Sequence, residues 1–195
     1  VEPYLDALDR LLDLVEAVEA EGIAIHHIDV GGGLGIQYTD EAPPPADELV
    51  TRLLQHIDAR GHGQRELLME PGRSLVGNAG VLLTEVIWVK PGVGHPYVIV
   101  DAAMNDLIRP AMYDAWHDFE AVVPTGQKMI ANIAGPVCES GDTFAKAREI
   151  DVVKSGDLAV FRTTGAYGAT MASTYNSRAL VPEVMVDGDR WAIVA

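Results

Sequence analysis

One short stretch of this sequence sets the architecture: Leu67-Leu68-Met69-Glu70-Pro71-Gly72-Arg73. Its first three residues form an apolar run that predicts a buried strand. The carboxyl end of that strand then presents a carboxylate, a Pro-Gly turn and a guanidinium, at the edge of the sheet where α/β folds bind ligands. A simpler alternative is a surface ion pair between Glu70 and Arg73, which would contribute only about 0–1 kcal/mol.

The residues before this stretch predict alternating helices and strands. Leucines and valines recur with a helical period over residues 4–20, which indicates an amphipathic helix that ends at Gly22. The apolar run 23–30 predicts a buried strand, and residues 47–60 predict a second amphipathic helix. The order strand, loop, helix, strand is typical of a βαβ unit with parallel strands and a right-handed crossover.

A glycine-rich turn, Gly31-Gly32-Gly33, follows the first predicted strand. Backbone N–H groups that no side chain shields can wrap a phosphate, and a following helical turn would add a positive dipole. The alternative is an ordinary glycine turn. The spacing has neither a Walker lysine nor the G-x-G-x-x-G pattern, which argues against ATP and NAD. Two glycine-bearing strand ends in one unit favour a shared ligand.

The sequence pattern changes after Ser74, from alternating helices and strands to short strands. Short β-branched segments separated by Gly, Pro or Asp predict strands at residues 81–89, 97–101, 120–123, 128–134, 158–162 and 178–186. Asp187-Gly188 predicts a hairpin turn before a last strand at 191–194. We therefore expect an α/β domain over residues 1–79 and a mostly antiparallel β-domain over residues 80–195.

Composition narrows the class of protein. The formal net charge of −15 argues against nucleic acid as a partner, because phosphate binding needs clustered Lys and Arg. No apolar run reaches the ~20 residues that span a bilayer, so we expect no membrane partner. A single cysteine, Cys138, excludes an intrachain disulfide and a Cys-based zinc site and favours the cytoplasm. We expect no metal site. The first residue is not Met, which leads us to expect a fragment of a longer protein.

Several residues of the second half have simple structural explanations. Taken alone, Cys138 is expected to be a buried small residue beside the solvated acids Glu139 and Asp142, because buried structural cysteines are common. Tyr167 is explained equally well as an ordinary aromatic residue of a loop. The segment Arg109–Tyr113 is explained as a short helix whose first and last side chains cap and pack it.

Five motifs occur in the order and approximate spacing of one family: residues 29–35 (DVGGGLG), 70–73 (EPGR), 101–113 (DAAMNDLIRPAMY), 135–142 (GPVCESGD) and 165–168 (GAYG). On these motifs the chain resembles the meso-diaminopimelate decarboxylases, enzymes of lysine biosynthesis that depend on pyridoxal 5'-phosphate (PLP). The resemblance extends from about residue 23 to the C-terminus. It implies the alanine-racemase-like fold: here the C-terminal part of a PLP-binding TIM-type barrel, followed by a mostly antiparallel β-domain.

The resemblance implies roles for residues that contact the cofactor. Glu70 corresponds to the carboxylate that hydrogen-bonds the pyridine nitrogen of PLP, where an opposite charge favours the protonated ring. Tyr167 corresponds to a tyrosine that contacts both phosphate and substrate. The phosphate cradle corresponds to Gly31, Gly32 and Gly33, together with the backbone of Pro71, Gly72 and Arg73.

The resemblance also implies a substrate site. Arg73, Arg109 and Tyr113 correspond to residues that grip the substrate, and arginine suits bidentate binding of carboxylates. Cys138 corresponds to the proton donor, and a thiol is mostly protonated at neutral pH. Glu139 corresponds to the residue that recognises the distal end of diaminopimelate. In the family, the counterparts of Cys138 and Glu139 enter the site of the partner subunit, which implies a homodimer.

The implied reaction is decarboxylation of meso-2,6-diaminopimelate to L-lysine and CO₂, the last step of lysine biosynthesis. The alternatives are a related decarboxylase for ornithine, arginine or carboxynorspermidine, and a non-catalytic homologue that serves as a binding or regulatory module. The family's Schiff-base lysine lies early in the barrel and has no counterpart among the lysines of this chain. We therefore expect the isolated chain to be inactive and its partial barrel to be poorly soluble.

Overall fold

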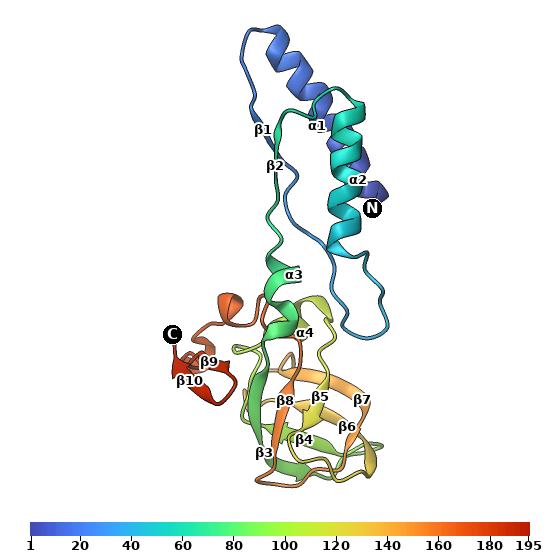
Figure 1. Cartoon of the computed structure of the whole chain (residues 1–195). Coiled ribbons are helices and arrows are strands. Elements are labelled where there is room, and N and C mark those ends of the chain that lie inside the picture. The colour runs from blue at the N-terminus through green and yellow to red at the C-terminus, as the bar shows by residue number, and fades with distance from the viewer. The chain divides into compact units, whose positions relative to one another are not determined.

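The computed structural model describes residues 1–195, which separate into two compact units, Val1–Leu75 and Val76–Ala195 (Figure 1). The first unit consists of helices and a short parallel sheet, whereas the second consists mainly of β-strands. Each unit has a hydrophobic core of its own. The two units are therefore described one after the other.

The first unit contains the helices and parallel strands that the sequence predicts. Its elements are α1 Glu2–Ala20, β1 His27–Asp29, α2 Ala46–Ala59 and β2 Glu66–Leu68, with α3 Gly72–Val76 at its end. The two strands pair in parallel with Ile28 opposite Leu67, which confirms the predicted βαβ arrangement. Strand β1 is much shorter than the apolar run 23–30. None of the chain's helices has both the length and the apolar character that crossing a membrane requires.

The core of the first unit lies where the two long helices meet the sheet. Its side chains recur every three or four residues along each helix, as one apolar helical face requires. They are Leu8, Leu12 and Val15 of α1 and Leu49, Leu53 and Ile57 of α2. Ile28 of β1 and Leu34 complete the cluster. This packing anchors β1 and thereby fixes where the glycine-rich turn begins.

The second unit is built on one six-stranded sheet with the order β5-β8-β3-β4-β6-β7. Its strands are β3 Leu82–Lys90, β4 Tyr97–Val100, β5 Phe119–Ala121, β6 Lys128–Ala134, β7 Thr143–Asp151 and β8 Leu158–Phe161. Strands β4 and β6 pair in parallel, and all other neighbours are antiparallel, as predicted for a mostly antiparallel domain. The edge strands β5 and β7 line one common pocket, so the sheet is nearly closed.

Short elements complete the second unit. They are α4 Arg109–Tyr113, the 3₁₀ turns Gly77–Ala79, Ala169–Met171 and Tyr175–Ser177, and the strands β9 Val184–Asp187 and β10 Arg190–Ile193. Strands β9 and β10 form an antiparallel hairpin around Gly188, whose φ is +62°. The hairpin that Asp187-Gly188 predicts is therefore confirmed.

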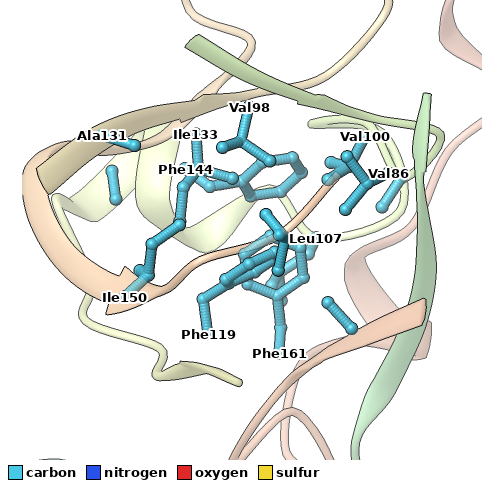
Figure 2. Close-up of a cluster of buried hydrophobic side chains, with 14 residues drawn as sticks. Val86, Val98, Val100, Leu107, Phe119, Ala131, Ile133, Phe144, Ile150 and Phe161 are labelled. Atoms are coloured by element: carbon cyan, nitrogen blue, oxygen red, sulfur yellow. The ribbon is translucent and has the colours of Figure 1, made fainter. Parts of the chain in front are cut away.

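The curved sheet of the second unit encloses an aromatic and aliphatic core (Figure 2). Phe161 of β8 is 1% exposed, and its ring centroid lies 5.2 Å from that of Phe119 and 4.4 Å from that of Phe144. Val98 and Ile133 enter the same core from the parallel strands β4 and β6. Burying a side chain of this size stabilises the fold by roughly 1.5–3 kcal/mol relative to exposure.

Strand β7 is the one long element that the sequence pattern did not predict. Alternation of polar and apolar residues fails there because the strand carries an irregularity. Ala147 has a φ of +46°, and the register between β6 and β7 shifts beside it. Phe144 and Ala145 are consecutive and both buried. A bulge of this kind removes the period of two by which a strand is recognised.

Two further expectations are wrong. The strand predicted at 178–186 shrinks to β9, because Pro182 lies inside the run and has no N–H for a strand ladder. The turn at Gly31–Gly33 leads into irregular chain and not into a helical turn, since the next helix begins at Ala46. The chain that follows this turn therefore adds no helix dipole, and the turn itself offers an anion its backbone N–H groups.

Candidate functional site

The glycine-rich turn and Glu70 lie next to each other in the first unit. Pairing continues beyond the strands, with the Val30 amide donating to the Leu68 carbonyl (3.1 Å) and the Glu70 amide donating to the Gly31 carbonyl (2.9 Å). Both motifs therefore leave the sheet at the same edge, where the carboxyl ends of parallel strands meet. The sequence placed both at strand ends, and the structure brings these two ends together.

The glycines of this turn are required by its geometry. A Cβ atom on Gly32 would lie 3.1 Å from the carbonyl carbon of Glu70 and closer still to its oxygen. Gly31 and Gly33 have φ values of +70° and +91°, in the region that side-chain-bearing residues rarely adopt. The turn thus exposes backbone directly beside the Glu70 strand end.

Two side chains to which the sequence assigned no role support the turn. The Tyr4 hydroxyl donates to the Gly32 carbonyl (2.8 Å), and burial raises the pKa of Tyr4. Asp29 accepts a hydrogen bond from the Gly31 amide through Oδ1 (2.8 Å). Tyr4 lies in α1, far away in the sequence, and belongs to no motif. Only the packing of α1 on the sheet reveals its role.

The EPGR motif turns directly into α3. The Gly72 amide donates to the Glu70 carbonyl (2.9 Å), and the Ser74 hydroxyl donates to the Pro71 carbonyl (3.1 Å). Glu70 is exposed, and Arg73 is partly buried in the first turn of the helix. This arrangement presents a carboxylate at the strand end and a guanidinium one short turn later.

In the second unit, Arg109 and Tyr167 lie close together. Arg109 is the first residue of α4 and is only 7% exposed, and its guanidinium carbon lies 5.7 Å from the centre of the Tyr167 ring. An Arg109 N–H group contacts Nε2 of His117 (3.2 Å), while Nδ1 of His117 faces the Arg162 carbonyl (2.9 Å). Arginine only donates, so Nε2 accepts and the proton resides on Nδ1.

His117 is therefore held as a neutral imidazole that orients Arg109. Burial, and after it the positive charges of Arg109 and Arg148, lower the pKa of His117 below its usual value. His117 is another residue that the sequence did not single out. It follows the DAAMNDLIRPAMY motif by four residues, and no spacing rule connects it with Arg109.

The loop around Tyr167 also depends on glycine. Tyr167 has a φ of +67°, an uncommon conformation for a residue with a side chain, and is 42% exposed. A Cβ atom on Gly168 would lie 3.4 Å from the carbonyl carbon of Thr164 and nearer to its oxygen. The loop therefore holds the Tyr167 backbone in a tight turn while leaving its ring accessible.

Cys138 and Glu139 lie on the loop between β6 and β7. Both are exposed, so the expectation of a buried structural cysteine is wrong. The Glu139 carboxylate accepts a hydrogen bond from the Gly141 amide (3.1 Å). The expectation that Asp142 is solvated is also wrong, because it is only 3% exposed. Its buried carboxylate accepts backbone N–H bonds from two segments. A short loop closed by a buried acid thus presents the thiol and the Glu139 carboxylate to solvent.

A cleft of about 740 Å³ borders this loop. Tyr113 at the end of α4 lines it together with Ser140 and Gly141, which directly follow Glu139. Tyr113 is 61% exposed. Within the second unit, the structure therefore groups Arg109 with Tyr167 and places Tyr113 near the Cys138–Glu139 loop.

The chain matches known proteins over nearly its whole length. The family described as "Pyridoxal-dependent decarboxylase, C-terminal sheet domain" matches residues 7–165. A diaminopimelate decarboxylase of Zymomonas mobilis is 49% identical over 193 residues, which cover 98% of this chain and 45% of that protein. The chain thus spans about half the length of the curated relatives it matches.

Solved structures agree with this result. The crystal structure of diaminopimelate decarboxylase from M. jannaschii with L-lysine has a TM-score of 0.92 and 35% identity, covering 98% of this chain and 45% of that chain. A structure of SrLDC with PLP and cadaverine has a TM-score of 0.81 and 25% identity, covering 92% of this chain and 47% of that chain. The predicted architecture, part of a barrel followed by a β-domain, is confirmed. The chain belongs to the family of pyridoxal-dependent decarboxylases.

Proposed function

We propose that this chain is the C-terminal part of a PLP-dependent diaminopimelate decarboxylase, which converts meso-2,6-diaminopimelate to L-lysine and CO₂. The observation that carries the proposal is the meeting of the Gly31–Gly33 turn with Glu70 at one pair of parallel strand ends. We assign residues 1–79 to the PLP-binding barrel and residues 80–195 to the β-domain, a boundary four residues after the one between the two compact units. We place the enzyme in the cytoplasm, because its single cysteine forms no disulfide.

The residues at this edge fit PLP. The backbone amides of Gly32 and Gly33 take part in none of the hydrogen bonds within the first unit. Two such amides suit a phosphate group, and we assign the adjoining Pro71–Arg73 turn to the same cradle, although Pro71 has no N–H and the Gly72 amide donates to the Glu70 carbonyl. The exposed Glu70 carboxylate at the same edge suits the ring nitrogen, whose protonated form it would stabilise. Bound PLP supplies an electron sink for the bond that breaks at the substrate carboxylate.

We assign substrate binding to residues whose charges and hydroxyl groups complement a substrate with two amino groups and two carboxylates. Arg73 and Arg109 are suited to carboxylates, and His117 keeps the Arg109 guanidinium in a fixed orientation. Tyr167 and Tyr113 supply exposed hydroxyl groups. Glu139 supplies a negative charge for the distal ammonium group. Only a substrate with charged groups at both ends uses this whole set.

Cys138 is the group that returns a proton to the substrate carbon after CO₂ departs. Its thiol is exposed on the β6–β7 loop, so a ligand bound outside this loop can reach it. We further propose that Cys138 and Glu139 serve the active site of a second copy of the chain. The working enzyme is then a homodimer with shared sites.

A substrate panel tests this function in the full-length protein loaded with PLP. We expect release of CO₂ and L-lysine from meso-diaminopimelate and no comparable turnover of ornithine, arginine or carboxynorspermidine. Cys138→Ala should bind PLP as the unchanged protein does but lose most of its turnover. Turnover of ornithine alone would reassign the substrate, and PLP binding without any turnover would favour a non-catalytic homologue.

A further inference from the structure

A buried carboxylate, Asp142, closes the loop that carries Cys138 and Glu139. The loop runs from Gly135 to Asp142 between β6 and β7, and Asp142 is 3% exposed. Its backbone joins the two ends of the loop, because the Gly135 amide donates to the Asp142 carbonyl (3.0 Å). The Asp142 amide donates in turn to the Glu139 carbonyl (3.0 Å). The backbone of this residue therefore sets the shape of the loop.

The side chain of Asp142 makes a second connection. Oδ2 accepts a hydrogen bond from the Val137 amide (2.7 Å), one residue before Cys138. Oδ1 accepts a hydrogen bond from the Met104 amide (2.7 Å), which belongs to the segment that ends at Arg109 and α4. Both bonds are short and charge-assisted, the stronger class of hydrogen bond. One carboxylate thus joins two functional segments that are far apart in the sequence.

The space around this carboxylate admits only glycine at the start of the loop. A Cβ atom on Gly135 would lie 2.6 Å from Cγ of Asp142 and closer to both of its oxygens. Burial raises the pKa of Asp142, while the Val137 and Met104 amides oppose that rise. Holding the Asp142 carboxylate in place therefore has two costs: its desolvation, and the exclusion of any side chain at position 135.

We propose that Asp142 is the positioning residue that fixes the Cys138–Glu139 loop against the Met104–Arg109 segment. Asp142 itself does not touch the substrate and acts only through the residues that do. This inference rests on the proposed function for its catalytic consequence, because it takes Cys138 as the proton donor. The geometric part, that Asp142 controls the exposure and placement of the thiol, stands on the hydrogen bonds alone.

Asp142→Asn in the full-length protein is the first test. An amide keeps the shape but presents NH₂ to one of two backbone N–H groups, so one bond is replaced by repulsion between donors. We expect kcat/KM for diaminopimelate to fall about tenfold or more, as the loss of one charge-assisted bond implies. PLP affinity should stay within about twofold, because the residues proposed to bind PLP make none of these hydrogen bonds. The alkylation rate of Cys138 by iodoacetamide, followed by mass spectrometry, should change at least threefold.

Asp157→Asn is the matched control. Asp157 likewise accepts a backbone N–H bond within a turn of the second unit, from the Lys154 amide (2.9 Å), but it lies near none of the proposed site residues. We expect this variant to keep kcat/KM and the Cys138 alkylation rate. A general loss of stability would affect both variants, whereas positioning of the thiol affects only Asp142→Asn.

Gly135→Ala, which retains Asp142, covers the case in which Asp142→Asn does not fold, and a double-mutant cycle with Asp142→Ala adds a test where that background folds. Gly135→Ala displaces the carboxylate and should reduce turnover and change Cys138 alkylation, whereas in an Asp142→Ala background it should change little. Equal effects of Gly135→Ala in both backgrounds would overturn the proposal, as would alkylation rates equal to those of Asp157→Asn. If diaminopimelate is not turned over at all but Asp142→Asn still alters alkylation, the proposed function fails and the positioning role stands.

Discussion

Replacing Gly32 with alanine tests whether the Gly31–Gly33 turn and Glu70 form one seat for the cofactor. Ordinary van der Waals contact begins at 3.4 Å, and the new Cβ would lie 3.1 Å from the Glu70 carbonyl carbon and nearer to its oxygen. The carbon must therefore retreat by about 0.3 Å and the oxygen by more. Neither can yield by a side-chain rotation, because both belong to backbone at the ends of paired strands.

The cost follows from what this separation disrupts. The 2.9 Å hydrogen bond from the Glu70 amide to the Gly31 carbonyl weakens, which costs about 1 kcal/mol. Overpacking adds about 1–3 kcal/mol. The strained turn relaxes in the free protein and must regain its original geometry to bind PLP, so this cost is taken from the binding free energy. Because 1.4 kcal/mol corresponds to about a tenfold change in a binding constant, we expect the full-length protein to lose at least tenfold in PLP affinity. Equilibrium dialysis against PLP measures this loss.

Gly61→Ala is the control for this experiment. Gly61 has a φ of +81° with no atom near its missing Cβ, and it follows α2 at a distance from the seat. Left-handed strain of about 1–2 kcal/mol should lower the melting temperature without changing PLP affinity. If Gly32→Ala binds PLP as tightly as Gly61→Ala does, the turn and Glu70 do not share a ligand.

Three further changes test the fold and its electrostatics. Phe161→Ala empties a site that is 1% exposed and should lower the free energy of unfolding in urea by about 3–5 kcal/mol, whereas Leu83→Ala, at 57% exposure, should change it little. The pKa of His117 is lowered in the folded state, so the unfolded state takes up its proton first and stability should fall as pH drops below about 6.5. Melting temperatures measured between pH 5 and 8, roughly the range in which His titrates, should therefore depend less on pH in His117→Gln. Arg60 pairs with Glu16 and two other carboxylates of α1, so Arg60→Ala should destabilise the protein at low salt and much less at high salt.

Each of these three predictions would be contradicted by a specific result. A Phe161→Ala loss below about 1 kcal/mol would mean that the site collapses around the missing ring or that the core is not packed as described. Equal pH slopes in the unchanged protein and in His117→Gln would show that His117 titrates normally. An Arg60→Ala effect that persists unchanged in high salt would assign its role to packing and not to charge.

The sequence predicts those parts of the fold whose residues follow a simple period. Helices α1 and α2 keep apolar residues at helical spacing, and β1 and β2 end at glycine-bearing turns, so their order and parallel pairing are predictable. Strand β7 escapes because the φ of +46° at Ala147 breaks its alternation. Pro182 limits β9 in a way that an apolar run conceals. Strand bounds cannot be predicted from alternation of polar and apolar residues where the backbone is locally irregular.

The candidate site is predictable where short motifs carry it and not where tertiary contacts do. Glu70 and Gly32 are evident from their motifs, and the structure adds that their backbones touch. Tyr4 and His117 act through hydrogen bonds to residues distant in the sequence or in another element. Asp142 looks like a solvated acid until the two backbone amides that it binds are known. Burial of a polar group depends on its partners, which spacing alone does not specify.

A crystal structure of the full-length protein with PLP tests the central claim most directly. We predict that the Glu70 carboxylate lies about 2.7–3.2 Å from the pyridine nitrogen and that the phosphate accepts hydrogen bonds from the amides of the Gly31–Gly33 turn. A pyridine nitrogen bound by another residue, or a phosphate held away from this turn, would contradict the assignment of the two strand ends as the cofactor seat.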